Sequence, residues 1–294
     1  MACYVLAFAQ AKTAGVASAH ERPNVRRRHR GLSYPIAFQD DHMYQPVSDF
    51  VEILRTERRD LLNRLRATRF SKLKDGYTHA QIIPHTSYSP WYDDAEFMAI
   101  YEQISANTLV DIYRCYELWT LARQTRSLEG DVVEVGVWRG GTGALLACAN
   151  RVKVVHLFDT FTGVAKADPE FDTLYTGGEH ADTDESIVRS LFSKLNAKFE
   201  IHRGIFPDDT LAALPEKVSL AHIDVDTYQS IRQSFEAIWP RIQPRGVVVF
   251  DDYAAFGCEG AAQAVNELAA QTPDAFFVHN INGHALMIKV GVAG

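Results

Sequence analysis

The hydrophobic positions in the N-terminal part of the chain recur with the spacing of α-helices. Apolar side chains return every three or four positions between residues 46 and 70, and again near residues 94–105 and 108–127. This period places them on one face of each helix. We expect residues 46–128 to form a helical cap, or lid, segment. Residues 1–45 show no clear period, and we expect them to form a loosely ordered arm.

After Gly130 the pattern changes to short apolar runs that alternate with helical stretches. Each run has the length of one β-strand, and continuous apolar strands separated by helices are typical of a parallel sheet covered on both faces. Residues 129–294 are therefore predicted to form an α/β domain. The expected strands are residues 132–137, 153–159, 199–204, 218–224 and 246–252.

The last two strands are expected to form a hairpin. The segment AFFVHNINGHALMIKV places Asn282-Gly283 between two β-rich runs, which favours a two-residue hairpin turn. The sheet should therefore close with an antiparallel strand. The sheet of a nicotinamide-dependent dehydrogenase is normally parallel throughout, so this hairpin disfavours that class.

A glycine-rich loop follows the first strand of the α/β region, in the segment EVGVWRGGTGALLA. Gly136 permits a tight turn, and Gly140 and Gly141 let the backbone approach a ligand where a helix begins. The spacing is neither G-x-G-x-x-G nor that of a P-loop. Glu134, just before the first glycine, suits a ligand that carries a cationic amino group.

Asp159 ends the next strand, where an acidic residue can accept hydrogen bonds from both ribose hydroxyls of a nucleotide-like ligand. The alternative role for Asp159 is a helix cap or a turn. The glycine loop and this acid together predict a ligand that contains adenosine.

Four aspartates lie at the ends of two neighbouring predicted strands. Asp224 ends one strand, with Asp226 two residues later, and Asp251-Asp252 end the next. The carboxyl ends of such strands meet at one crevice, so these carboxylates should converge. Oxygen ligands alone fit Mg²⁺, Mn²⁺ or Ca²⁺ better than zinc or copper. The alternative is that Asp226 and Asp252 cap the helices that follow them.

Two histidines lie close to these aspartates in the sequence. We expect His222, in the strand before Asp224, to be a packed, hydrogen-bonded core residue. His284 follows the hairpin turn, and we expect a polar residue flanking the turn, or else one that faces the substrate.

The motifs EVGVWRGGTGALLA, FDTFTG, HIDVDTYQS and GVVVFDDY resemble those of the macrocin O-methyltransferase family. This family belongs to the class I S-adenosylmethionine-dependent methyltransferases and includes enzymes that methylate sugars and phenols in antibiotic pathways. The resemblance runs from about residue 82 to the C-terminus. It implies a Rossmann-like fold with a mostly parallel seven-stranded sheet, and Mg²⁺ held by Asp224, Asp251 and Asp252. The cofactor contacts that it implies are Thr108, Glu134, Gly136, Gly140, Thr142, Asp159, Gly204 and Phe206.

The predicted function is transfer of a methyl group from S-adenosylmethionine to a hydroxyl of a small secondary metabolite, a sugar or a phenol. A divalent ion that holds the hydroxyl oxygen lowers its pKa and fixes its position. Asp224 or Asp226 takes the proton, and the sequence leaves open which of them does. Two alternatives remain: an NAD(P)-dependent oxidoreductase, and a non-catalytic cofactor-binding scaffold with the same fold.

Charge and cysteine content narrow the partners. The net charge of −7 disfavours binding to nucleic acids or to an anionic membrane, and no apolar run is long enough to span a membrane. The four cysteines lack paired or metal-type spacing, which favours a reducing, cytoplasmic location. The family resemblance implies a homo-oligomer, a dimer or larger.

Overall fold

The computed structural model describes residues 59–71, 73–84, 86 and 88–291. The arm predicted for residues 1–45 and the first half of the helix predicted from residue 46 lie outside these residues. The described part of that helix is α2 (Arg59–Ala67). It is followed by a short antiparallel pair, β1 (Arg69–Ser71) and β2 (His79–Ala80). The sequence did not predict this pair, because two or three residues are too few to show an alternating pattern.

The two helices predicted near residues 94–105 and 108–127 are confirmed as α3 (Ala95–Ile104) and α4 (Ile112–Gln124). α4 begins later than predicted because Asp111 caps it. The Asp111 carboxylate accepts hydrogen bonds from the backbone N–H groups of Tyr113 and Arg114 at 2.9 and 3.1 Å. Short 3₁₀ turns connect several elements: η1 (Pro90–Tyr92), η2 (Ser105–Asn107), η3 (Thr125–Ser127), η4 (Leu211–Ala213) and η5 (Trp239–Arg241).

The α/β region forms a seven-stranded sheet, as predicted, with the order β5-β4-β3-β6-β7-β9-β8 in the described part of the chain. β9 runs antiparallel to both of its neighbours, β7 and β8, while the other pairs are parallel. The strands are β3 (Asp131–Val135), β4 (Val155–Asp159), β5 (Phe199–Arg203), β6 (Val218–Ile223), β7 (Ile242–Phe250), β8 (Ala275–His279) and β9 (Ala285–Lys289).

Two details of the strands differ from the prediction. β3 ends at Val135, two residues early, because Gly136 turns the chain with a φ of +86°. The hairpin between β8 and β9 is present, but its connection runs from Asn280 to His284 and is therefore longer than two residues. The Asn280 N–H donates to the His284 carbonyl at 3.0 Å, and Gly283 takes a φ of +118°.

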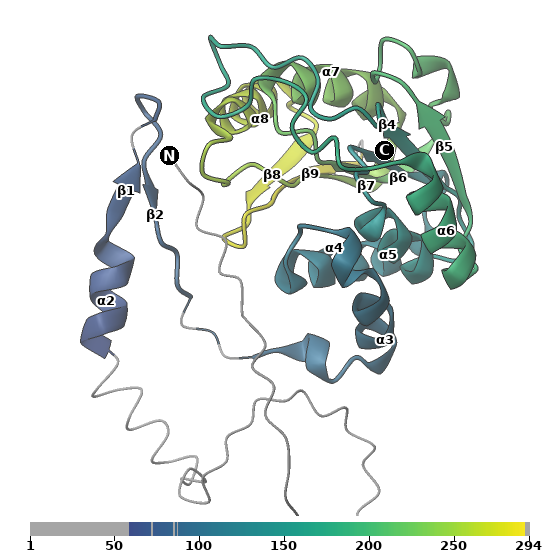
Figure 1. The fold of residues 1–294 in the computed structure, drawn as a ribbon, viewed down its shortest axis with the longest axis horizontal. Helices are drawn as coiled ribbons and strands as arrows, with labels where there is room; N and C mark the ends of the chain where they lie inside the picture. The colour runs from purple at the N-terminus through teal and green to yellow at the C-terminus, as the bar shows by residue number, and fades with distance from the viewer. Residues whose placement is uncertain (1–58, 72, 85, 87, 292–294) are drawn as a thin grey trace, which may run out of the picture. The chain divides into compact units, whose positions relative to one another are not determined.

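Helices cover both faces of the sheet (Figure 1). α3, α4, α5 (Gly141–Ala149) and α6 (Glu185–Leu195) lie on one face, and α7 (Tyr228–Ile238) and α8 (Glu259–Gln271) on the other. Because side chains alternate along a strand, Val132 packs with Trp119 and Leu145 in one hydrophobic core. Its neighbour Val133 packs with Ile231 in the other core. The carboxyl ends of the parallel strands lie between these two layers of helices.

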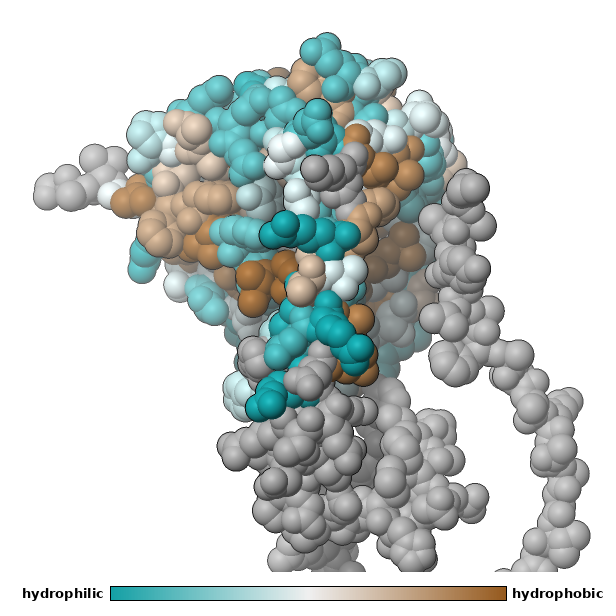
Figure 2. Space-filling view, turned by 90° about the vertical axis from the view of Figure 1, so that its left-hand side faces the viewer, coloured by the Kyte–Doolittle hydropathy of each residue, from teal (hydrophilic) through white to brown (hydrophobic). Residues whose placement is uncertain are grey.

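None of the helices among the described residues has both the length and the apolar character needed to cross a bilayer. Figure 2 shows hydrophobic and hydrophilic residues interspersed over the face that it presents.

Candidate active site

The glycine loop between β3 and α5 passes very close to neighbouring backbone. A side chain at Gly136 would place its Cβ atom 1.7 Å from the Asp224 carbonyl oxygen, and Gly136 also has a positive φ. Gly140 is the N-cap of α5 with a φ of +83°. These positions require glycine because an L-residue would clash or be strained there. The loop therefore runs directly beside the carboxyl end of β6.

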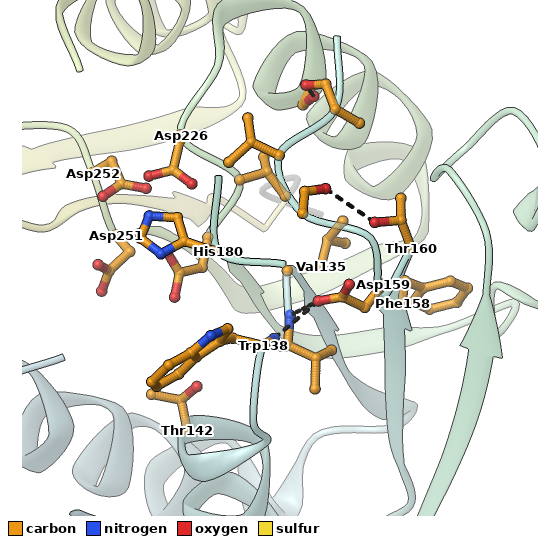
Figure 3. Close-up of a pocket in the computed structure, with 18 of the residues that line it drawn as sticks. Val135, Trp138, Thr142, Phe158, Asp159, Thr160, His180, Asp226, Asp251 and Asp252 are labelled. Carbon is orange, nitrogen blue, oxygen red and sulfur yellow. Dashed lines mark hydrogen bonds between the residues drawn. The ribbon is translucent and has the colours of Figure 1, made fainter. Parts of the chain in front are cut away.

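Asp159, at the end of β4, fastens this loop. Its Oδ2 accepts hydrogen bonds from the backbone N–H groups of Val137 and Trp138 at 2.6 and 2.9 Å, and its Oδ1 accepts from Phe161 N–H at 2.6 Å. Figure 3 shows the two bonds to the loop. A carboxylate offers about four acceptor positions, so these bonds leave capacity for a ligand hydroxyl.

A cavity of about 280 Å³ opens over the strand ends beside the loop. It is large enough to approach the ~300 Å³ lower end of small-molecule sites. Most residues predicted for the site line it. Those residues are Thr108, Gly136, Thr142, Asp159, Gly204, Phe206, Asp224, Asp226, Asp251 and Asp252.

Glu134 and Gly140 lie outside this lining. The Glu134 side chain is fully buried on the α5 side of the sheet, and its Oε1 lies 3.0 Å from Nδ1 of His222. Its Oε2 is buried and has no hydrogen-bond partner among the described residues, so a contact of Glu134 with a cationic group of the ligand stays a prediction. Both faces of this strand are buried, so the hydrophobic pattern could not show which way Glu134 points. Gly140 faces Val188 and serves the turn into α5.

The predicted acidic trio comes together in the cavity. Carboxylate oxygens of Asp224, Asp251 and Asp252 all lie within 4.8 Å of one another. Figure 3 shows Asp251 and Asp252 beside Asp226, on the opposite side of the cavity from Asp159. Oδ2 of Asp252 is buried and has no hydrogen-bond partner among the described residues. Three adjacent carboxylates with a free buried oxygen form an all-oxygen donor set, which suits a hard divalent cation.

The pKa values of the cavity aspartates show that, without a cation, their ionised forms are disfavoured. Burial raises the pKa of Asp224 well above its usual value, and the charge of Asp251 raises it further. Burial, followed by the charges of Asp226 and Asp224, likewise raises the pKa of Asp252. Burial also raises the pKa of Asp226. Like charges this close disfavour ionisation of the whole set.

The alternative that Asp226 and Asp252 cap the following helices is wrong. Thr227 is the N-cap of α7, and Cys258 is the N-cap of α8. Asp226 instead has a φ of +62° and its side chain lies with those of Asp252 and Cys258. Both aspartates are therefore available to a ligand of the cavity.

Asp251 differs from the other aspartates because basic side chains surround it. Nε2 of His284 lies 2.8 Å from Oδ1 of Asp251, Arg114 Nη1 donates to Oδ2, and Nε2 of His222 lies 3.5 Å from Oδ1. Burial opposes ionisation of Asp251, but the contacts with His222, His284 and Arg114 outweigh it and lower the pKa. Asp251 is thus held as a carboxylate.

These contacts belong to a buried network behind the cavity. His284 is fully buried and bridges Asp251 to Glu117 of α4, whose Oε2 lies 2.5 Å from Nδ1 of His284. Asn280 and Asn282 of the hairpin also donate to the Glu117 carboxylate. Burial alone would raise the pKa of Glu117, but these hydrogen bonds lower it. We refer below to Glu117, Glu134, His222, Asp251, His284 and Arg114 as the histidine network.

His222 is a packed, hydrogen-bonded core residue, as predicted. Burial alone would lower its pKa, but the contacts with the carboxylates of Asp251 and Glu134 raise it to about 10. The sequence prediction missed Arg114 and Glu117. They lie three residues apart on α4, whose buried positions are otherwise apolar. Two charged residues at inward positions of an apolar helix face are the signal from which they could have been predicted.

The long connection between β4 and α6 covers part of the cavity, and the sequence prediction did not include it. Tyr175 and His180 from this connection line the cavity. Its end is tied to the glycine loop, because Trp138 Nε1 donates to Asp182 Oδ1 at 2.9 Å and Arg139 Nη2 lies 2.7 Å from Asp182 Oδ2. Thr183 Oγ1 also donates to the Trp138 carbonyl. The connection therefore closes one side of the cavity.

Comparisons with known proteins agree with this geometry. The chain is 29% identical over 151 residues to the 8-demethyl-8-(2,3-dimethoxy-alpha-L-rhamnosyl)-tetracenomycin-C 4'-O-methyltransferase of Streptomyces olivaceus, a match that covers 45% of this chain and 56% of that protein. It is 31% identical over 149 residues to the mycinamicin III 3''-O-methyltransferase of Micromonospora griseorubida, covering 45% and 58%. The chain thus spans little more than half the length of these two relatives.

The fold is also found among solved structures. The O-methyltransferase NovP has a TM-score of 0.56 and 21% identity, with 63% of this chain and 83% of NovP covered. This likeness identifies the fold as that of the class I O-methyltransferases. The sequence model of the macrocin-O-methyltransferase (TylF) family matches residues 103–281, which is more than half of the chain and includes the glycine loop and all four aspartates of the cavity. The chain therefore belongs to the macrocin-O-methyltransferase family.

Proposed function

We propose that this protein transfers a methyl group from S-adenosylmethionine to a hydroxyl oxygen of a small secondary metabolite, a sugar or a phenol. The observation that carries the proposal is that the acidic trio and the glycine loop with Asp159 line one cavity. The names of two relatives specify O-methylation, one of them on a rhamnosyl-bearing tetracenomycin. A sugar hydroxyl is therefore the first acceptor to test.

S-adenosylmethionine would occupy the part of the cavity beside the glycine loop. Gly136 keeps the loop free of a side chain at its closest approach to β6, and Asp159 holds the loop in place. Thr108, Thr142, Gly204 and Phe206 line the same space. Asp159 has acceptor capacity left for ribose hydroxyls. The cofactor supplies a methyl group that is already activated for transfer, so the protein has to align a nucleophile with it.

The acidic trio fits a divalent ion, and we propose Mg²⁺ held by Asp224, Asp251 and Asp252. The fit rests on three carboxylates with oxygens within 4.8 Å and on the buried, unpartnered oxygen of Asp252. Bound there, the ion would offset the repulsion between the carboxylates and lower the pKa of a hydroxyl beside it. The histidine network keeps Asp251 ionised and fixed in orientation for this role.

The proton of the acceptor hydroxyl would pass to a carboxylate oxygen of Asp224 or Asp226, both of which line the cavity. The connection that carries Tyr175 and His180 limits the access of water to this side. Water exclusion strengthens the electrostatic interactions of the site. The acceptor would enter past Leu109, a cavity-lining residue with an exposed apolar side chain.

Methyl transfer from labelled S-adenosylmethionine to a panel of glycosylated and phenolic acceptors, with Mg²⁺ or with excess chelator, tests the proposal. We expect labelled product with Mg²⁺ and none with chelator. Full activity in chelator would remove the metal from the mechanism. Binding of S-adenosylhomocysteine without turnover of any acceptor would favour the non-catalytic scaffold, and binding of NADH in its place would favour the oxidoreductase.

Calorimetry tests the cofactor site separately. We expect S-adenosylhomocysteine to bind, and Asp159→Ala to weaken that binding greatly, because it removes both the anchor of the loop and the acceptor for the ribose. Asp159→Asn, which keeps one acceptor oxygen, is the matched control and should retain more affinity. Equal affinity in all three proteins would contradict the assignment of this residue.

We also propose that the protein is a cytoplasmic homo-oligomer. Cys115, Cys148 and Cys258, the cysteines among the described residues, are buried free thiols, which agrees with a reducing compartment. Light scattering at the working concentration tests the oligomeric state, and a monomer mass would contradict it.

A further inference from the structure

A second cluster of metal-ligand side chains lies at the edge of the sheet, away from the cavity. Glu200 and His202 are alternate residues of the edge strand β5, so both point to the same face. His156 of β4 stands opposite Glu200 in the parallel register. The three side chains therefore meet on one face of two neighbouring strands, and none of them lines the cavity.

The distances between the ligand atoms suit a tetrahedral metal site. His156 Nδ1 lies 3.2 Å from His202 Nε2 and 3.6 Å from Glu200 Oε2, and His202 Nε2 lies 3.9 Å from the same oxygen. Ligands 2.0–2.2 Å from zinc in a tetrahedral site are about 3.3–3.6 Å apart. Two of the distances are close to this range, and rotation of the exposed Glu200 side chain would shorten the third.

The surroundings of His156 resemble the support that metal-binding histidines usually have. Its other ring nitrogen, Nε2, lies 3.6 Å from Oδ2 of Asp131, while Oδ1 of Asp131 accepts a hydrogen bond from Val154 N–H at 3.1 Å. A carboxylate behind a ligand histidine orients the ring and selects its tautomer. The two imidazole rings are nearly parallel, at 9°, so they are held in a defined arrangement.

The burial of the two histidines and the lowered pKa of His202 favour binding of a metal ion by this cluster. The histidine side chains are 10% and 16% exposed, whereas Glu200 is 57% exposed, so a fourth position is open to water. Burial and the neighbouring His156 lower the pKa of His202, which keeps its ring neutral and able to bind a metal. Imidazole ligands favour Zn²⁺ and related transition metals, whereas Mg²⁺ favours oxygen ligands alone.

We propose that His156, His202 and Glu200 form a binding site for a divalent transition-metal ion of the zinc class, with Asp131 as the group that orients His156. Such an ion would fasten the edge strand β5 to β4. β5 leads directly into Gly204 and Phe206 of the cavity. The site would thus stabilise one wall of the cofactor pocket without taking part in the chemistry.

Metal titration of the full chain tests this proposal. The protein is stripped with chelator, exchanged into buffer with excess Mg²⁺ to occupy the acidic trio, and titrated with Co²⁺ and with Zn²⁺. We expect wild type to bind one more equivalent of Zn²⁺ than His156→Ala or His202→Ala, and Co²⁺ to give the intense visible absorption of a four-coordinate site in wild type alone. Histidines elsewhere in the chain contribute equally to all these proteins.

Two further variants keep the test decisive if a histidine variant folds poorly. Glu200→Ala removes an exposed side chain, so it should fold normally, and we expect it to weaken Zn²⁺ binding at least tenfold. His279→Ala removes the exposed histidine of β8, at the other edge of the sheet, and should bind Zn²⁺ like wild type. Zn²⁺ should also raise the melting temperature of wild type and of His279→Ala only. Equal Zn²⁺ stoichiometry and affinity in wild type, His202→Ala and Glu200→Ala would overturn the proposal and leave the two histidines as a hydrogen-bonded pair.

Discussion

Asp251 and Asp252 are adjacent in the sequence, yet they belong to two regions with opposite electrostatics. Behind the cavity, the carboxylates of the histidine network each face a histidine, and Asp251 also receives a hydrogen bond from Arg114. In the cavity, Asp224, Asp226 and Asp252 lie close to one another, and Oδ2 of Asp252 has no partner among the described residues. The pKa values of Glu117 and Asp251 are lowered, while those of the three cavity aspartates are raised.

The difference separates carboxylates that support the fold from those that serve a ligand. A buried charge that is paired and hydrogen-bonded is tolerated, and removal of its partner is costly. A buried carboxylate that faces other carboxylates destabilises the folded state when it is ionised. A bound cation would offset this repulsion, and the cluster is therefore consistent with the metal site that we propose. Asp251 is shared by the two regions, so it links the rigid network to the proposed metal site.

The largest effect should follow from changes in the cavity cluster. We expect Asp224→Asn to lower kcat by about 10²–10⁴-fold, the usual range for loss of a general base, since it removes either the base or a metal ligand. The free energy of unfolding measured in chelator should stay the same or rise, because one repelling charge has become neutral. Turnover of labelled cofactor and urea denaturation measure the two quantities.

Asp226→Asn is the matched variant that assigns the base. If Asp226 is the base, its loss should lower kcat without changing the Mg²⁺ concentration needed for half-maximal activity, whereas Asp224→Asn should raise that concentration. A large loss of stability in either variant would contradict the distinction between the two regions.

Changes in the histidine network should act on stability first. We expect His284→Ala to lower the free energy of unfolding by about 3–5 kcal/mol, the usual cost of breaking a buried ion pair, because it leaves Glu117 and Asp251 buried without their shared partner. Urea denaturation in chelator isolates this effect from metal binding. His279→Ala removes an exposed histidine of β8, and it should change the free energy of unfolding by less than about 0.5 kcal/mol. Equal effects in both variants would show that the network is not stabilising.

The sequence was enough to predict that the three aspartates of the acidic trio meet. Asp224 and the Asp251-Asp252 pair follow consecutive parallel strands, and chain connectivity places the ends of such strands side by side. The hairpin was predictable because Asn-Gly between two β-rich runs is a local signal, although the length of its turn was not. The sheet and the acidic trio could therefore be predicted from local patterns and from the rule that consecutive parallel strands lie side by side.

The histidine network could not be predicted in the same way. It joins α4 to the ends of β6, β7 and the β8–β9 hairpin, and its pairs are 137 and 167 residues apart in the sequence. No local pattern records such pairings, since each residue alone looks like an exception in an apolar segment. The face to which Glu134 points could not be predicted for a related reason: a strand buried on both faces shows no alternation that would tell one face from the other.

Mg²⁺ should distinguish the two regions by its effect on thermal stability. We expect Mg²⁺ at about 100 times its dissociation constant to stabilise wild type by roughly 2.7 kcal/mol, the value that mass action gives for a ligand of the folded state alone. Asp252→Asn should lose most of this stabilisation, while Glu117→Gln should keep it, from a lower starting stability. Melting curves with and without Mg²⁺ measure both. Stabilisation by Mg²⁺ that persists in Asp252→Asn would place the ion elsewhere.

The smallest effect should come from the exposed tie between the cavity cover and the glycine loop. Asp182 contacts Trp138 and Arg139 at the surface, and exposed pairs of this kind contribute little to stability. We expect Asp182→Ala to leave the free energy of unfolding nearly unchanged and to raise KM for the cofactor a few-fold, because the cover is held less firmly against the glycine loop. kcat should stay nearly unchanged, since the reacting groups are intact. The exposed acid Glu236, on the outer part of α7, supplies the control variant Glu236→Ala, which should leave KM unchanged. A fall in kcat as large as that of Asp224→Asn would mean that the cover takes part in the chemistry, and the division between supporting and reacting carboxylates would then have to include Asp182.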